Sequence, residues 1–324
     1  METFIRRAPR AAALVAAVLL LALPPFVSSF MLSLMTQALV WAMLAMSLDL
    51  LLGYIGLASL GHAAYLALGA YSVGILTTRH GADFWTSLAV GIAVAALGAA
   101  VFGLVALRAT GVYFLMITLA LGMTVWGLAN RWVSLTSGDN GIAGVPRPRG
   151  LPWDVSGALP FYYLVLVAFA VAFVVLWTVV HSPFGKTLVG IRESESRMRT
   201  LGYHVWLHKY IAFVIAGAAG GFAGVFWGYY NGFVSPADAE LATSVEILLM
   251  VALGGRGTLF GPVLGAFVIV LLRNVVSIYT HRWLLILGAV YIGTIVYAPE
   301  GIIGMARDWL KARARAPLRP APSP

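Results

Sequence analysis

The chain has 324 residues, of which 61% are hydrophobic and 10% charged, and it carries a formal net charge of +9. A soluble globular domain carries about 25% charged residues, so a chain this apolar is expected to be surrounded largely by lipid. The sequence contains no cysteine, which excludes a disulfide framework, a thiolate metal site and a cysteine nucleophile. Lys and Arg lie in short segments beside apolar runs, a pattern that argues for a membrane protein and against nucleic-acid binding.

Long apolar segments follow one another along the chain. A spanning helix needs roughly 20 apolar residues, and backbone groups in hydrocarbon must bond within the helix. The predicted spans are Ala11–Phe30, Met31–Leu52, Leu57–Ile75, Thr86–Leu107, Gly111–Trp132, Leu159–His181, Tyr210–Gly232, Ser244–Leu253, Leu259–Val275 and Trp283–Ala298. The segment Ser244–Leu253 is too short to cross alone, so the count is nine or ten. The predicted fold class is an all-α, polytopic transmembrane bundle with broken helices.

The positions of Lys and Arg predict the orientation. The arginines before the first apolar run place the N-terminus in the cytoplasm, and we interpret that run as a retained helix rather than a cleaved signal peptide. By counting spans we expect a cytoplasmic N-terminus (residues 1–10), a single permease domain (11–304) and a basic, disordered cytoplasmic tail (305–324). Within the domain we expect a periplasmic loop (133–158) and a cytoplasmic loop (182–209).

A faint internal repeat links the two halves of the chain. Gly61 and the segment Leu68–Tyr71 match Gly257 and the segment Leu264–Phe267 at one constant offset. Repeated halves with glycine-broken helices are typical of transporters, and the breaks point to the substrate path. So short a match also arises by chance in an apolar chain, so both interpretations stay open.

The first predicted break combines glycines with Ser59 and His62, directly after Asp49. A glycine-rich segment in lipid is a weak helix that can unwind and present backbone groups to a cavity. An ionisable residue inside a span is a functional candidate. The alternative is that the glycines allow close helix packing, that His62 bonds a carbonyl group and that Asp49 lies at a helix end in the headgroup region.

The second predicted break precedes Pro262. Glu246 and Arg256 are the charges that we consider near it, and they either form an ion pair or face opposite interfaces. The predicted helix-break glycines are Gly53, Gly56, Gly61, Gly254, Gly255, Gly257 and Gly261. The candidates for a translocation path are Asp49, Ser59, His62, Tyr65, Thr118 and Glu246.

The predicted cytoplasmic loop contains an amphipathic pattern. Two Glu–Arg pairs at i,i+4 have Glu on the N-terminal side, the favourable order for an exposed helix. A short apolar stripe and a terminal glycine complete the pattern. The residues concerned are Arg192, Glu193, Glu195, Arg197, Leu201 and Gly202. The helix is predicted either to dock into a groove of a cytosolic partner or to lie on the lipid.

Two motifs are similar to parts of nucleotide-binding or catalytic sites but lack residues that those sites require. The segment Gly185–Thr187 is similar to the end of a phosphate-binding loop, but Val180 stands where the first glycine is required and no strand precedes it. Ser59 and His62 lie three residues apart on one element, without a second His at membrane depth to serve an intramembrane serine protease. We therefore expect no catalytic residue, no metal and no cofactor bound by this chain.

Five segments also occur as motifs of one family, in this order. They are Ser59–Tyr65 with Gly69–Tyr71, Arg108–Ala120, Leu135–Pro148, Ser182–Gly202 and Val245–Ala266. From roughly Met31 to Gly304 the chain resembles the LivM-type permeases of branched-chain amino acid ABC importers. Ser137 and Asn140 depart from the usual Gly-Gly-Asp-Asp-Gly loop of that family, and Arg256 replaces a common apolar residue.

The resemblance implies a subunit that moves branched-chain amino acids across the bacterial inner membrane, and we expect it to work by alternating access. It also implies a second, LivH-type permease, two cytosolic ATPases that bind ATP and Mg²⁺, and a periplasmic binding protein. The segment from Arg192 to Gly202 is then the coupling helix that meets an ATPase. The alternatives are a urea or short-amide permease and an ATP-independent secondary transporter, which would need Asp49 or Glu246 as an ion relay.

Overall fold

A computed structural model describes residues 18–279, 285–286, 288–289, 292–293 and 301–305. The predicted span Trp283–Ala298 and the tail beyond residue 305 lie largely outside these residues. The elements are η1 (Pro24–Phe26), α2 (Ser29–Leu52), α3 (Ala63–His80), α4 (Phe84–Ala106), α5 (Val112–Arg131), α6 (Val133–Thr136), η2 (Gly138–Asn140), β1 (Ile142–Ala143), α7 (Ala158–His181), α8 (Pro183–Glu193), α9 (Glu195–Thr200), α10 (Val205–Asn231), β2 (Phe233–Val234), η3 (Pro236–Ala239), α11 (Leu241–Gly254) and α12 (Phe260–Tyr279).

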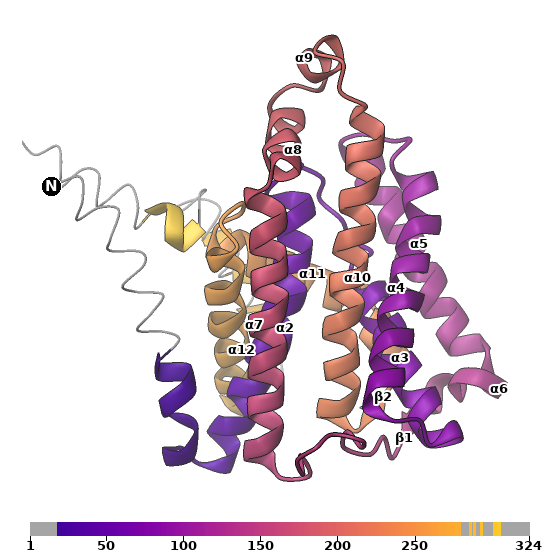
Figure 1. The fold of residues 1–324 in the computed structure, drawn as a ribbon, viewed down its shortest axis with the longest axis vertical. Helices are drawn as coiled ribbons and strands as arrows, with labels where there is room; N and C mark the ends of the chain where they lie inside the picture. Colours follow the sequence, from indigo (N-terminus) through magenta and orange to yellow (C-terminus); the bar gives the residue numbers. More distant parts are fainter. Residues whose placement is uncertain (1–17, 280–284, 287, 290–291, 294–300, 306–324) are drawn as a thin grey trace, which may run out of the picture.

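The long helices lie side by side in one bundle (Figure 1). Six helices of the described chain are long and apolar enough to cross a membrane, namely α2, α4, α5, α7, α10 and α12. This confirms the predicted all-α, polytopic class. Helices α8 and α9 lie at one end of the bundle, which we call the α9 end, and the antiparallel pair β1–β2 lies at the other, which we call the β end.

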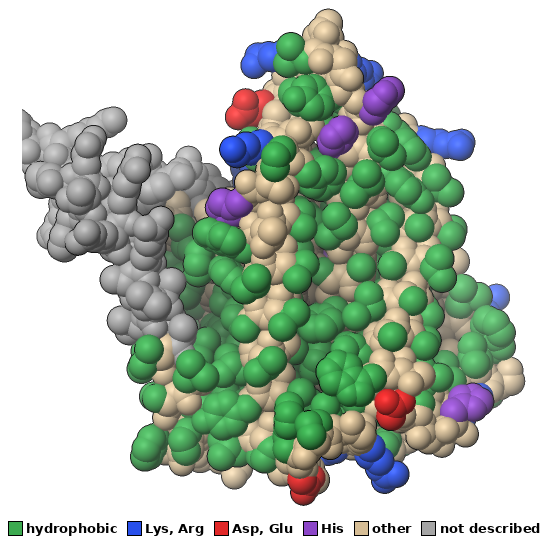
Figure 2. Space-filling view, viewed as in Figure 1, with side chains coloured by type: hydrophobic (Ala, Val, Ile, Leu, Met, Phe, Trp, Pro, Cys, Tyr) green, Lys and Arg blue, Asp and Glu red, His purple; other side chains and the backbone are tan. Residues whose placement is uncertain are grey.

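The side chains are distributed as expected for contact with lipid. In the view of Figure 2 hydrophobic side chains cover the length of the bundle, whereas charged side chains gather at the α9 end and the β end. Helices α2 and α10 are the most buried of the six long helices, and α4 and α5 are the least buried. The core therefore surrounds α2 and α10, and α4 and α5 form part of the outer surface.

Small residues bring α4 and α10 into close contact. A Cβ atom added to Gly221 of α10 would overlap the Cβ of Ala95 of α4, and one added to Gly217 would overlap the Cβ of Ala99. The two positions on each helix are four residues apart, which is the spacing of one helix face. Without a hydrophobic driving force between helices in lipid, close packing of this kind is what holds them together.

Several predicted boundaries were wrong. Helix α2 begins at Ser29 because the hydroxyl of Ser28 caps it, after a short 3₁₀ turn that contains two prolines. Helix α3 begins at Ala63 rather than Leu57, because the glycine-rich segment before it is irregular and Gly56 has φ +83°. It continues to His80 and ends on Gly81 in the left-handed conformation. Both predicted breaks exist, and α3 and α12 each follow one of them.

Candidate functional site

Asp49 joins the two breaks at the α9 end of the bundle. Its side chain is completely buried, and its two carboxylate oxygens accept hydrogen bonds from the backbone N–H groups of Gly257, at 2.7 Å, and Leu259, at 3.2 Å. Leu259 has φ +56°, an uncommon conformation for a residue with a side chain. Asp49 therefore satisfies and fixes the irregular backbone that precedes α12.

Arg192 links α8 to the same place. Its guanidinium donates a hydrogen bond to the carbonyl oxygen of Gly53, just beyond the end of α2. A Cβ atom added to Gly53 would overlap the carboxylate of Asp49 and the backbone of Gly257. The glycine therefore allows three segments, the end of α2, the start of α12 and the end of α8, to meet without an intervening side chain.

The other residues predicted for the path lie inside the bundle. His62 is completely buried, and its Nε2 lies 2.7 Å from the hydroxyl of Ser47 of α2. Tyr65 packs against His62 and Phe213 of α10. Ser59 is buried and accepts a hydrogen bond from the N–H of Gly61. These contacts hold the first break within the core, and a role in lining the path stays a prediction.

Hydroxyl groups tie the first break to two further helices. Thr118 of α5 accepts a hydrogen bond from the N–H of Leu60 at 3.2 Å, and Ser244 of α11 accepts one from the N–H of Ala63 at 3.1 Å. Buried backbone N–H groups that lack helical partners need such acceptors. The irregular segment between α2 and α3 is thus a defined part of the structure, held on both sides.

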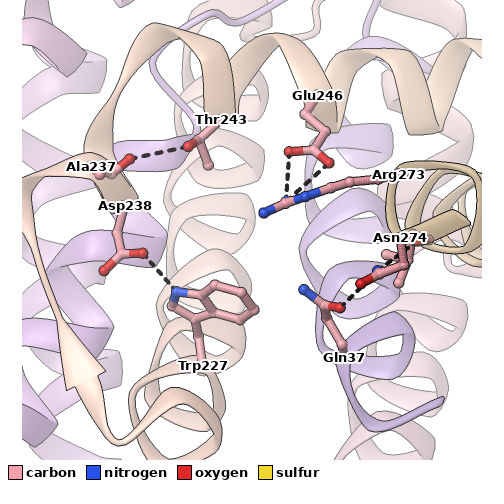
Figure 3. A network of polar contacts seen from close by, with 9 residues as sticks. Gln37, Trp227, Ala237, Asp238, Thr243, Glu246, Arg273 and Asn274 are labelled. Carbon is pink, nitrogen blue, oxygen red and sulfur yellow. Dashed lines mark hydrogen bonds and ion pairs between the residues drawn. The ribbon is translucent and has the colours of Figure 1, made fainter. Parts of the chain in front are cut away.

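Glu246 of α11 pairs with Arg273 of α12, and not with Arg256, which is exposed. Nη1 of Arg273 lies 3.3 Å from each carboxylate oxygen of Glu246 (Figure 3). Nearby, the side-chain amide of Asn274 donates to Gln37 of α2 at 3.4 Å. The sequence analysis missed Arg273, although a charge inside the predicted span Leu259–Val275 was a signal that could have found it.

The predicted amphipathic helix at the α9 end is two helices. Ser194 has an extended backbone, and its hydroxyl accepts a hydrogen bond from the N–H of Arg197, so it ends α8 and caps α9. The break lies between Glu193 and Arg197, which removes their expected i,i+4 relation. Glu195 and Arg199 do form the expected i,i+4 ion pair, with Oε2 of Glu195 3.4 Å from Nη2 of Arg199. Glu195 also pairs with the buried Lys209 of α10.

A groove opens between these short helices and the start of α10. Its floor and walls combine apolar and basic side chains, and Leu201 is 66% exposed at its edge. The lining residues are Pro183, Phe184, Lys186, Thr187, Gly190, Met198, Leu201, Tyr203 and His208. An apolar groove with basic groups beside it, on a charged end of the bundle, has the chemistry of a docking surface for another protein.

At the β end the long loop after α5 is bound to the bundle. Ile142 pairs with Val234, and Arg147 donates to the carbonyl oxygen of Tyr229 while its guanidinium lies 4.0 Å from the ring centre of Phe161. Burial lowers the pKa of Arg147. At the start of α4 the hydroxyl of Thr86 donates to Asp83 and lowers the pKa of that carboxyl. The contacts of Ile142 and Arg147 therefore hold the loop after α5 in a fixed position on the bundle.

Ser137 in this loop has φ +63°, the left-handed conformation that glycine adopts most readily. We expect Ser137→Gly to raise the stability of the purified protein by up to about 1 kcal/mol, and Ser137→Val to lower it by roughly 1–3 kcal/mol. Thermal unfolding in detergent would measure both. Ser134→Gly, within α6, is the control and should be destabilising. A destabilised Ser137→Gly variant would show that the serine hydroxyl outweighs the backbone conformation.

Among the described residues no group of three His, Asp or Glu side chains could hold a metal ion.

Residues 30–295 match the family described as "Branched-chain amino acid transport system / permease component". The chain is 30% identical over 319 residues to the "High-affinity branched-chain amino acid transport system permease protein LivM" of Escherichia coli K12, covering 91% of this chain and 75% of that relative. The protein of the same name from Salmonella typhimurium LT2 is 30% identical over 320 residues, or 92% of this chain and 75% of the relative.

A more distant relative comes from Methanocaldococcus jannaschii and is named "Probable branched-chain amino acid transport permease protein LivM". It is 24% identical over 311 residues, which cover 80% of this chain and 89% of the relative. No solved structure matches this chain significantly. The likeness therefore comes from sequence, and it extends across both helix breaks and the α8–α9 segment.

Proposed function

This chain belongs to the branched-chain amino acid transport permease family, and from that premise we propose that it is the subunit of an ABC importer through which branched-chain amino acids cross the bacterial inner membrane. It is a multi-pass membrane protein. The family match over most of its length carries the proposal. We assign no covalent chemistry to this chain.

The proposed assembly contains a second, LivH-type permease, two cytosolic ATPases and a periplasmic binding protein. ATP and Mg²⁺ are bound by the ATPases and not by this chain. The α9 end faces the cytoplasm, as does the N-terminus, because the loop from α7 to α10 is rich in basic residues and such loops stay on the cytoplasmic side. The basic residues of that loop are Lys186, Arg192, Arg197, Arg199 and Lys209.

The groove between α8, α9 and α10 is the proposed site of contact with an ATPase. Its exposed apolar edge supports this role, since such an edge is normally covered by a partner. Arg192 connects α8 to Gly53, and Asp49 connects the end of α2 to the start of α12. Movement of an ATPase against α8 and α9 therefore reaches both helix breaks through a short series of hydrogen bonds.

A pull-down from mild detergent tests the assembly. We expect the tagged native chain to bring down the second permease and the ATPases. Leu201→Glu should reduce the amount of ATPase recovered at least tenfold, because a charge replaces the exposed apolar side chain at the edge of the groove, while the second permease remains bound. Arg108→Glu, in the exposed turn between α4 and α5, is the matched control and should behave as the native chain.

Two outcomes would count against the proposal. If the native chain came out of the membrane without any ATPase, the chain would not work as an ABC permease. If Leu201→Glu kept its ATPase, the groove would not be the docking site. The substrate is tested separately, by uptake of radioactive leucine and of urea into proteoliposomes that contain the full complex. Uptake of urea without uptake of leucine would contradict the proposed substrate.

A further inference from the structure

The ion pair of Glu246 and Arg273 lies within the apolar part of the bundle. Glu246 is 5% exposed, whereas the side chain of Arg273 is 35% exposed and reaches from α12 towards α11 (Figure 3). Charged side chains at membrane depth are costly and normally face the interior of a bundle or a water-filled space. A partly exposed guanidinium in a spanning helix therefore points to a polar passage beside α12.

Polar side chains lead from the β end to this pair. Ser33, Gln37 and Trp41 lie four residues apart on one face of α2. Ser33 lies at an exposed position 2.8 Å from the hydroxyl of Tyr230, and Gln37 contacts Asn274, the neighbour of Arg273 in sequence. The stripe thus begins at the surface of the β end and reaches α12 one residue from the charged pair.

The hydrogen bonds around the pair are long. One nitrogen of Arg273 is shared between both oxygens of Glu246 at 3.3 Å, and the bond from Asn274 to Gln37 measures 3.4 Å, against about 2.9 Å for a typical N–H···O bond. The buried indole N–H of Trp41 has no hydrogen-bond partner among the residues described. Bonds of this length are weak, so a ligand that offers groups of the same kind can replace them.

Aromatic rings lie one helical turn beyond Gln37 on α2. The rings of Trp41 and Trp227 meet edge to face with their centres 5.3 Å apart, and Trp227 is fixed by a 2.7 Å hydrogen bond to Asp238. Figure 3 shows Trp227 of α10 and Glu246 of α11 on the side to which the guanidinium of Arg273 points. The region thus combines the pair of Glu246 and Arg273 with a rigid apolar surface, and the carboxylate of Asp238 is occupied by its bond to Trp227.

We propose that Glu246 and Arg273 form a binding site for an amino-acid zwitterion on its way through the permease. The α-carboxylate of the ligand binds Arg273, its α-ammonium binds Glu246, and its aliphatic side chain packs on Trp41 and Trp227. The inference rests on the proposed transport function. A zwitterion replaces each member of the pair by a group of the same charge, so neither Glu246 nor Arg273 loses a charged partner when the pair opens. A solute without charged groups cannot make this exchange.

Ligand analogues that each lack one charge test the two contacts separately. Radioactive leucine is bound to the purified permease–ATPase complex in the absence of binding protein. It is then displaced with one of three unlabelled competitors, namely leucine, leucinamide or 4-methylpentanoate. Leucinamide lacks the carboxylate and 4-methylpentanoate lacks the ammonium group. We expect the native complex to prefer leucine at least tenfold over each analogue. Arg273→Gln should abolish the preference over leucinamide, and Glu246→Gln the preference over 4-methylpentanoate, because each variant removes the partner of one group.

The double variant Glu246→Gln/Arg273→Gln removes both charges of the pair together and protects the test against misfolding. It should assemble with its partners and lose both preferences, and uptake of leucine into proteoliposomes should fall at least tenfold. Stimulation of ATP hydrolysis by the loaded binding protein should stay within about twofold of the native value.

The inference is overturned if the native complex binds no leucine, if the preferences survive in the variants, or if ATPase stimulation falls together with uptake, which would mark a structural ion pair. In each of these cases a native complex that still imports leucine leaves the proposed function intact. A native complex that imports no branched-chain amino acid refutes the proposed function, and this inference with it.

Discussion

Replacing Asp49 with alanine should cost the protein several kcal/mol of stability and abolish transport. The variant leaves the N–H groups of Gly257 and Leu259 without acceptors in a buried place. Each unsatisfied buried group costs about 1–3 kcal/mol, so the expected loss is roughly 2–6 kcal/mol. The left-handed backbone of Leu259 would also lose the contact that fixes it. Thermal unfolding of the purified permease pair and leucine uptake in proteoliposomes measure the two effects.

Asp49→Asn serves as the graded control for this experiment. The amide oxygen can accept one of the two hydrogen bonds, whereas the amide nitrogen cannot accept the other. We therefore expect a loss of stability that is smaller than that of the alanine variant. A stable Asp49→Ala variant would show that water or a backbone shift replaces the carboxylate. If that stable variant lost transport nonetheless, Asp49 would act in the path, as the sequence first indicated, rather than in holding the two breaks together.

Gly265→Ala should be the most damaging single-methyl addition in α12. A Cβ atom at this position would overlap the backbone carbonyl oxygen of Met250 in α11, and a backbone atom cannot move aside as a side chain does. The two helices must separate, which breaks contacts along both and is expected to cost about 1–3 kcal/mol, the usual range for overpacking. We would measure the yield of folded protein from membranes and its melting temperature in detergent.

Gly127→Ala in α5 is the matched control, because a Cβ atom there would meet open space. Alanine is favoured over glycine within a helix by roughly 1 kcal/mol, so this variant should be neutral or slightly stabilised. The same substitution should therefore destabilise the protein at Gly265 but not at Gly127. Equal effects would mean that α11 and α12 are not packed as closely as the structure has them.

The bundle could be predicted from the sequence because its signals are local. An apolar run without charge, ended by glycine or a charged loop, shows both a span and its approximate limits, and the spans from α4 to α7 follow the prediction within two residues. The two breaks were also visible as clustered glycines. The start of α3 was misplaced because an apolar segment such as 57–62 looks like helix, although its backbone bonds to Thr118 instead.

The contacts of the candidate sites could not be predicted, because they join residues far apart in sequence. Glu246 pairs with Arg273, although Arg256 is nearer in sequence. This pairing depends on how α11 and α12 fold back on each other. The bond from Arg192 to Gly53 joins residues that are 139 positions apart in sequence. The break at Ser194 was visible in principle, since serine competes for backbone groups and favours a helix start over a helix interior.

The close contact between α4 and α10 limits how this protein can change shape. Two backbones that touch through Gly221 and Ala95 have no long side chains between them whose rotamers could change and allow the helices to slide. Helix α3 joins this contact, since Gly69 lies equally close to Gly221. The three helices thus form one rigid unit, and the freedom to shear is left to helices such as α7, which contains no glycine and meets its neighbours through larger side chains.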